Sequence, residues 1–237
     1  MIESAKGEFA CGTADRPDPE PNFDGLAAVY RWMEWLSFGP FLGRARCVFL
    51  PSMIGARRAL VLGDGDGRFT QALLRTNPAV AVDAVDVSRG MLQSLLRAAG
   101  ADAGRVRVKV QNAATWTPDP AADYDIVATH FFLDCLRNED VLALAERVRP
   151  SLAPQAQWVV SEFAVPANSF GRWVARPVVQ SLYWAFRVMT GLNMQRLPNW
   201  QAALRSAGFA LVEERQWLHG LLTSQLWKVT AAAEESA

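Results

Sequence analysis

Residues that hold metals or form disulfides are scarce in this chain of 237 residues, which has two histidines and three cysteines. The cysteines, Cys11, Cys47 and Cys135, are odd in number and widely spaced, so they fit neither a disulfide framework nor a CxxC metal motif. His130 and His219 have no ligand-like spacing to each other or to the cysteines. We therefore expect reduced thiols and no structural metal.

The chain also lacks an excess of charge and a long apolar run. Its 24 basic side chains balance 24 acidic ones, so the net charge gives no reason to expect a nucleic-acid partner. No segment has 18 uninterrupted apolar residues, and the first residues lack the basic and apolar regions of a secretory signal. These absences predict a soluble, cytoplasmic protein without nucleic acid and with at most peripheral membrane contact.

What is abundant is apolar side chains, which make up 51% of the residues, enough for one domain with a sizeable core. Closely spaced prolines mark residues 1–22 as a flexible leader. Residues 23–56 have apolar side chains at helical spacing, which predicts N-terminal helices leading into the domain. We therefore expect a single domain over residues 23–237.

Beyond residue 56, apolar runs alternate with amphipathic segments. Strands are predicted within 57–67, 79–88, 106–113, 124–132, 158–166, 209–218 and 220–230, and helices within 68–78, 89–100, 138–154 and 198–209. Alternating strands and helices imply a mostly parallel sheet covered on both faces. The last two strands are separated by a short turn, so they are antiparallel neighbours. The expected architecture is a doubly wound, Rossmann-like α/β fold with seven strands and an antiparallel C-terminal hairpin.

A loop with three alternating glycines follows the first strand: Gly63, Gly65 and Gly67. Glycines there let a ligand approach backbone that a Cβ would block, which is typical of a nucleotide cradle. Arg68 stands where the dinucleotide motif GxGxxG needs glycine, and no GK[ST] is present. Asp64 and Asp66 would repel a pyrophosphate, so a cationic or neutral ligand fits better. The alternative is a tight turn that binds nothing.

Polar side chains follow the next strands. Asp86 ends the second strand, where a carboxylate can accept both ribose hydroxyls of an adenosine ligand, although a helix N-cap is the alternative. Asn112 follows the third strand and offers an amide near the adenine edge. Thr129 and His130 end the fourth strand and are expected beside the reactive end of the ligand, since open α/β sheets bind ligands outside their carboxyl edges.

The glycine loop, Asp86, the strand order and the closing hairpin resemble a class I S-adenosylmethionine-dependent methyltransferase, over nearly the whole chain from Phe23. Within that superfamily the chain is most similar to the ubiquinone and menaquinone C-methyltransferase-like group. This likeness lies in FDGLAAVYRWMEWLSFG around Tyr30, in SEFAVP around Glu162, and in AGF before a hairpin that ends in Lys228.

Some positions depart from that pattern. Val61 occupies the place where the first motif usually has an acidic residue, and Asn112 stands where aspartate is common. HFFLDCL is not the fourth-strand sequence of the quinone enzymes. These departures keep the subgroup open and leave a non-catalytic S-adenosylmethionine-binding protein as one alternative.

The resemblance implies S-adenosyl-L-methionine as the cofactor. Combined with the reasoning on individual residues, it gives these predicted cofactor contacts: Tyr30, Gly63, Asp64, Gly65, Gly67, Asp86, Val87, Met91, Asn112, Ala113, Thr129 and His130. The sulfonium is already a strong electrophile, so alignment of acceptor, methyl carbon and sulfur supplies much of the rate. Tyr30 and nearby aromatic rings can cover the sulfonium charge.

A general base is needed only if the acceptor must lose a proton. His130 is the candidate, with Asp134 or Glu162 as orienting or substitute carboxylates. The alternative for His130 is a hydrogen-bonded wall residue without a catalytic role.

Residues 168–197 carry aromatic and arginine side chains and are predicted to form a helical lid over an apolar acceptor, with Trp173, Tyr183 and Trp184 contacting it. An amphipathic helix that only closes the core is the alternative. The expected partner is a hydrophobic small molecule, for example a quinone-like or lipid-like one. Other interpretations are an N- or O-methyltransferase of a natural product, a dehydrogenase and, from another class, a non-catalytic cofactor-binding or scaffold protein.

Overall fold

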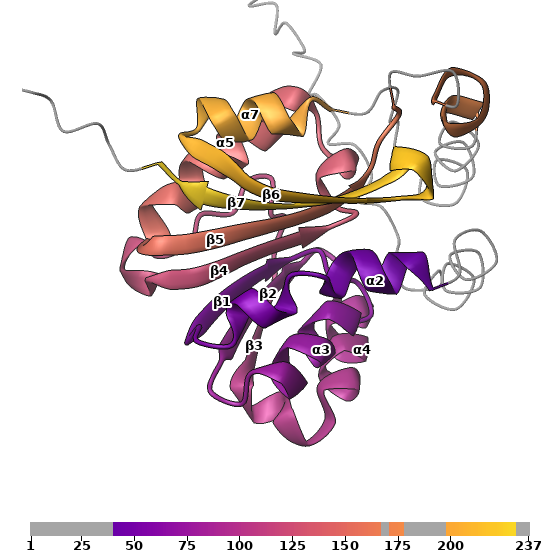
Figure 1. Ribbon diagram of the computed structural model, residues 1–237. Helices are drawn as coiled ribbons and strands as arrows, with labels where there is room; N and C mark the ends of the chain where they lie inside the picture. Colours follow the sequence, from indigo (N-terminus) through magenta and orange to yellow (C-terminus); the bar gives the residue numbers. More distant parts are fainter. Residues whose placement is uncertain (1–39, 167–170, 178–197, 231–237) are drawn as a thin grey trace, which may run out of the picture.

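The computed structural model of the protein describes residues 40–166, 171–177 and 198–230, and its centre is a seven-stranded sheet (Figure 1). The strand order is β3-β2-β1-β4-β5-β7-β6. The strands are β1 Arg58–Leu62, β2 Ala81–Asp86, β3 Val106–Val110, β4 Tyr124–His130, β5 Leu152–Phe163, β6 Phe209–Trp217 and β7 Leu222–Val229.

Strands β1 to β5 pair in parallel, and β7 is antiparallel to both β5 and β6. The order reverses at β1, since β2 lies on one side of it and β4 on the other. This arrangement confirms the predicted doubly wound sheet with an antiparallel C-terminal hairpin. In such sheets the point of reversal opens a crevice at the carboxyl ends of the strands, which is where ligands bind.

Helices cover both faces of the sheet: α2, α3 and α4 lie on one side, and α5 and α7 lie on the other (Figure 1). Their bounds are α2 Phe41–Cys47, α3 Arg68–Thr76, α4 Arg89–Ala99, α5 Asn138–Val148 and α7 Trp200–Ser206. Shorter helical turns are η1 Leu50–Met53, η2 Gly100–Arg105, η3 Pro120–Ala122, η4 Leu133–Cys135, η5 Arg149–Ser151, η6 Gly171–Ala175 and η7 Leu218–Gly220.

Parts of three predicted segments lie outside the described residues. The leader 1–22 and Tyr30 are among them, and the N-terminal helical region is described only from residue 40, as α2 and η1. Of the predicted lid, only residues 171–177 are described, so Tyr183 and Trp184 are not placed. The domain limits, the leader and the lid therefore stay predictions.

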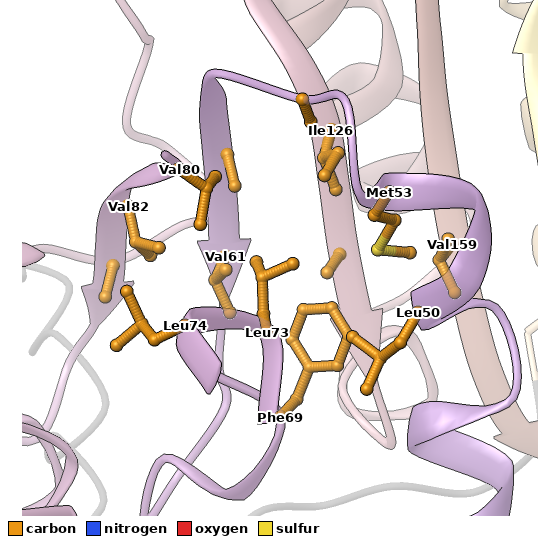
Figure 2. Packing of buried hydrophobic residues seen from close by; sticks show 14 of the residues in the cluster. Leu50, Met53, Val61, Phe69, Leu73, Leu74, Val80, Val82, Ile126 and Val159 are labelled. Carbon is orange, nitrogen blue, oxygen red and sulfur yellow. The ribbon is translucent and has the colours of Figure 1, made fainter. Parts of the chain in front are cut away.

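The core on the α3 side forms because α3 places apolar residues on one face. Phe69, Leu73 and Leu74 are buried against the sheet, and the Phe69 ring lies beside Leu50 of η1 (Figure 2). Val61 of β1 belongs to the same cluster. Burying each such side chain contributes about 1.5–3 kcal/mol. This packing fixes the start of α3, and with it the end of the glycine loop.

The core on the opposite face is built around tryptophans. Trp158 of β5 packs edge-on against Phe209 with ring centroids 5.3 Å apart, and Trp200 of α7 packs against Trp227 at 6.4 Å. Both sheet indoles donate hydrogen bonds inside the core, Trp158 to Thr129 Oγ1 at 3.0 Å and Trp227 to Gln225 Oε1 at 3.1 Å. Buried indoles need such acceptors.

Strand β5 is longer than expected, because it begins at Leu152 and not near Trp158. Its pairing with β4 shifts register between Tyr124 and Ile126, so residues near Pro154 form an irregularity in the ladder. Proline cannot donate a ladder hydrogen bond and is tolerated at such places. The apolar pattern of 158–166 therefore located the regular part of the strand and missed its irregular beginning.

A buried carboxylate, Asp83 of β2, contacts side chains from three other strands, β1, β3 and β4. It accepts hydrogen bonds from Arg107 Nε at 2.8 Å and from the Tyr124 hydroxyl at 2.6 Å, and Arg58 Nη2 lies 3.5 Å away. Burial, followed by the hydrogen bond to Asp83, raises the pKa of Tyr124 above its ordinary value. Removing the carboxylate would leave the buried hydroxyl without its acceptor.

We expect Asp83→Ala to lower the free energy of unfolding by about 2–4 kcal/mol, because it breaks a buried, charged hydrogen-bond network. Urea denaturation followed by tryptophan fluorescence measures it. Asp102→Ala is the matched control: its pair with Arg105 is partly exposed, so the change should be below about 1 kcal/mol. Equal losses in the two variants would contradict the assignment of Asp83 to the core.

Candidate functional site

The loop between β1 and α3 carries the three glycines, and all of them have positive φ angles: 66° for Gly63, 59° for Gly65 and 83° for Gly67. Asp64, inside this loop, accepts hydrogen bonds from the first amides of α3, at 2.8 Å from Thr70 N and 3.3 Å from Phe69 N. Gly67 occupies the N-cap position and has no side chain to do this. Asp64 therefore ties the glycine loop to the helix.

The glycines differ in what surrounds them. An ideal Cβ on Gly63 would lie 2.2 Å from Phe132 Cδ2, and one on Gly67 would lie 2.6 Å from Leu95 Cα. Packing thus requires glycine at both positions. A Cβ on Gly65 would meet no described atom within 4 Å. Gly65 is therefore the glycine whose backbone faces open space, as a ligand cradle requires.

Asp86 lies next to that open backbone. Its Oδ1 accepts the Ser88 N–H at 2.8 Å, and the backbone N–H groups of Val87 and Gly65 also bond to its carboxylate. Burial raises the pKa of Asp86 above its ordinary value, while these three hydrogen bonds oppose the rise. Ser88 caps α4 by accepting from Met91 N at 3.2 Å, so the N-cap is Ser88 and not Asp86.

Apolar surface surrounds Asp86 on the side of α4. Val87 is 44% exposed and Met91 is half-buried. At the end of β3, Ala113 is buried, while Asn112 is exposed and its Oδ1 accepts the Ala114 N–H at 2.9 Å. The predicted adenine-side residues thus lie at the ends of neighbouring strands.

Two side chains at the end of β4 point to opposite faces of the sheet. Thr129 is fully buried and accepts the Trp158 indole hydrogen bond, so its hydroxyl is engaged in the core and not directed beside a ligand as expected. His130 packs on Phe69 with ring centroids 4.4 Å apart. Because Leu62 pairs with Thr129, the next residues along these strands, Gly63 and His130, are neighbours.

His130 is buried, and its Nδ1 lies 2.9 Å from Ser161 Oγ. Burial, and next the Arg46 charge, lowers the pKa of His130 to about 3. The imidazole is therefore neutral at physiological pH and a weak base.

The two carboxylates expected to orient His130, Glu162 and Asp134, make other contacts. Ser161 takes the orienting position, whereas Glu162 Oε1 accepts the backbone N–H groups of Phe132 and Leu133 at 3.0 and 2.8 Å. Asp134 is buried close to Glu162, where its charge contributes to raising the pKa of that residue. The prediction that either carboxylate orients His130 is not supported by these contacts.

A family model described as a methyltransferase domain matches residues 60–157, from β1 into β5, and so includes the glycine loop and Asp86. Residues 60–157 are thus similar to a methyltransferase domain. No curated protein sequence matches the chain significantly.

Solved structures share the fold at low sequence identity. A putative O-methyltransferase from Nostoc punctiforme has a TM-score of 0.67 and 17% identity, covering 88% of this chain and 61% of that one. The N,N-8-amino-8-demethyl-D-riboflavin dimethyltransferase from Streptomyces davawensis has a TM-score of 0.60 and 19% identity, covering 89% of this chain and 62% of that one. A possible exported protein from Bordetella parapertussis has a TM-score of 0.63 and 19% identity, covering 83% and 69%.

At these low identities, the structural matches show a shared fold and no more. The chain spans about three fifths of the length of the two methyltransferase structures. Within the described residues, no group of three or more His, Cys, Asp or Glu side chains is arranged to hold a metal ion. None of the helices in the described ranges combines the length and the apolar character needed to cross a bilayer.

The sequence reasoning missed two residues near the glycine loop. Phe132 packs on Gly63, and Arg46 of α2 is buried with its guanidinium 5.0 Å from the centre of the Phe131 ring. The sequence signal that could have pointed to this packing is the pair of phenylalanines, Phe131 and Phe132, directly after β4. The signal did not reveal that Phe131 adopts a positive φ of 54°.

Helix α2 is anchored to the same region. The hydroxyls of Ser161 and Ser224 both bond to the carbonyl oxygen of Ala45, at 3.0 and 2.7 Å. Ser161 also contacts His130, so one buried network joins β4, β5, β7 and α2. His130 thus belongs to a hydrogen-bond network that holds these elements together.

An apolar cluster lies at the carboxyl edge of the sheet beside this network. It joins α2, the ends of β4 and β5, η6 and the β6–β7 turn, through Leu42, Ala175, Leu221 and Leu222 with Phe41, Phe131, Phe163, Trp217 and Leu218 packed against them. Trp173, a predicted acceptor contact, is 75% exposed on η6.

The protein should show a pH-dependent stability that depends on Asp64. Burial raises the pKa of Asp64 to about 6, so the native state disfavours its charge and loses stability as pH rises through that value. Between pH 4 and 7 we expect wild type to lose up to roughly 2–3 kcal/mol relative to Asp64→Asn. Urea unfolding at several pH values measures the difference. Parallel pH profiles for the two proteins would contradict this pKa.

Proposed function

We propose that the methyltransferase domain binds S-adenosylmethionine at the carboxyl ends of β1 and β2 and transfers its methyl group to a hydrophobic small molecule. The observation that supports this best is the bond between the Asp86 carboxylate and the Gly65 amide, beside the open space at Gly65. It brings the predicted ribose acceptor and the predicted backbone cradle together. Val87, Met91 and Asn112 would then line the adenine side.

The charge of the loop suits this ligand better than a dinucleotide. Asp64 and Asp86 place two carboxylates near the cradle, where they would attract the ammonium and sulfonium groups and repel a pyrophosphate. A pKa of about 6 leaves Asp64 largely ionised at pH 7. These features favour a methyltransferase over a dehydrogenase.

The chemical step needs mainly alignment. The neutral, buried His130 is a weak base, so we propose an acceptor atom that attacks without proton removal by this residue. The bound cofactor supplies an activated methyl group, and the domain contributes position and exclusion of water. The apolar cluster around Phe131, Phe163 and Leu222 would form the wall on the acceptor side.

The class of acceptor has two candidates. A quinone-like or lipid-like molecule fits the apolar cluster and the sequence resemblance, with Trp173, Tyr183 and Trp184 as further proposed contacts. Methylation of oxygen or nitrogen in a natural product is the second candidate, supported by the names of the two similar methyltransferase structures. A cytoplasmic location remains part of the proposal.

Gly65→Ala tests the cradle. Its φ of 59° makes any side chain strained by about 1 kcal/mol, and the new methyl group would enter the ligand space. We expect affinity for S-adenosylhomocysteine, measured by calorimetry, to fall at least about tenfold.

Gly100→Ala is the matched control, because Gly100 also has a positive φ of 57° and open surroundings but lies at the end of α4. Because the ψ of Gly100 is −123°, a combination that residues with a Cβ rarely adopt, Gly100→Ala should lose at least as much stability as Gly65→Ala and keep wild-type affinity. Unchanged affinity in Gly65→Ala, or an equal fall in both variants, would count against the proposed site.

Acceptor class can be tested with a radiolabelled methyl donor and cell extracts. We expect label to enter a small molecule that partitions into organic solvent. Label in a water-soluble small molecule would instead favour the natural-product alternative. Cofactor binding without transfer to any extract would favour a non-catalytic binding protein.

A further inference from the structure

The turn after β4 is held in an unusual conformation. Phe131 has a φ of 54°, in the left-handed region that bulky residues rarely adopt. Its N–H donates to the Ser161 carbonyl at 2.7 Å, which continues the pairing of β4 with β5 by one residue. Such a conformation persists only where surrounding contacts fix it.

Glu162 of β5 supplies those contacts. Its Oε1 lies 3.0 Å from Phe132 N and 2.8 Å from Leu133 N, and the Asp134 backbone N–H also bonds to this carboxyl group. Successive amides that converge in this way form a nest for an oxygen acceptor. The side chain is fully buried, so water does not compete for these bonds.

The turn determines where the Phe132 ring lies. That ring fills the space where a Cβ of Gly63 would be, with Phe132 Cδ2 only 2.2 Å from the ideal Cβ position. Gly63 itself donates to the Val85 carbonyl at 3.0 Å, one residue before Asp86. The ring therefore packs against the first residue of the loop that carries Gly65.

We infer that Glu162 is a positioning residue for the cofactor site: it fixes the β4 turn, which presses Phe132 against Gly63. The inference rests on the proposed binding of S-adenosylmethionine. It replaces a role for Glu162 as a base or as the partner of His130, whose Nδ1 is bonded to Ser161.

The hydrogen bonds accepted by Glu162 make one substitution informative. Burial, and next the Asp134 charge, raises the pKa of Glu162 well above its ordinary value. A neutral carboxyl group still presents its carbonyl oxygen to backbone amides, and the side-chain oxygen of glutamine can do the same. Glu162→Gln should therefore keep the turn, while Glu162→Ala removes its acceptor.

The test compares affinities for S-adenosylhomocysteine by calorimetry. We expect Glu162→Ala and Phe132→Ala each to weaken binding at least about tenfold, and Glu162→Gln to stay within about threefold of wild type. In a double-mutant cycle, the loss in the combined alanine variant should match that of Phe132→Ala alone, because both changes act on the same ring. Should Glu162→Ala not fold, Glu162→Asp, shorter by one methylene, should give the weakened binding instead.

Asp83→Ala is the control for general destabilisation, since Asp83 is another buried carboxylate with hydrogen bonds in the same sheet. It should lower the melting temperature and keep affinity within about threefold of wild type. Wild-type affinity in folded Glu162→Ala, additive losses in the cycle, or equal losses in Asp83→Ala would overturn the inference. If wild type itself fails to bind, the proposed function fails and not this inference alone.

Discussion

The candidate site depends on one contact, in which the Asp86 carboxylate at the tip of β2 accepts the amide of Gly65 in the neighbouring loop. Parallel pairing of β1 with β2 brings these residues to one edge of the sheet. Positive φ at Gly65 leaves its backbone exposed to open space, and Asp64 fastens the other end of the loop to α3. Together these contacts make a backbone cradle with an acidic side.

Packing behind that edge keeps the cradle in shape. Phe69, near the start of α3, is buried in the core. Leu95 occupies the space that a side chain at position 67 would need, and Phe132 occupies the corresponding space at position 63. On the side of β4 and β5, the network of His130, Ser161 and Ala45 anchors α2 near the loop. The loop is thus supported from both neighbouring strands of β1.

Sequence reasoning recovered the sheet, its order of elements and the adjacency of the glycine loop to Asp86. Hydrophobic periodicity and the ends of strands depend on neighbouring residues in the sequence, so they can be predicted from it. It misassigned the environment of Thr129, which bonds to Trp158, and the partners of His130, which bonds to Ser161. These partners lie on another strand, so the contacts depend on packing between segments that are distant in the sequence. The positive φ of Phe131 and the three amides on Glu162 have no local signature either. For this reason the placement of the glycine loop beside Asp86 could be predicted from the sequence, and the β4 turn could not.

A crystal structure with bound S-adenosylhomocysteine tests the central claim most directly. The account predicts that the ribose hydroxyls lie within hydrogen-bond distance of the Asp86 carboxylate and that the ligand passes over the Gly65 backbone. Ligand density at another part of the domain, or an Asp86 side chain turned away from the ribose, would contradict it.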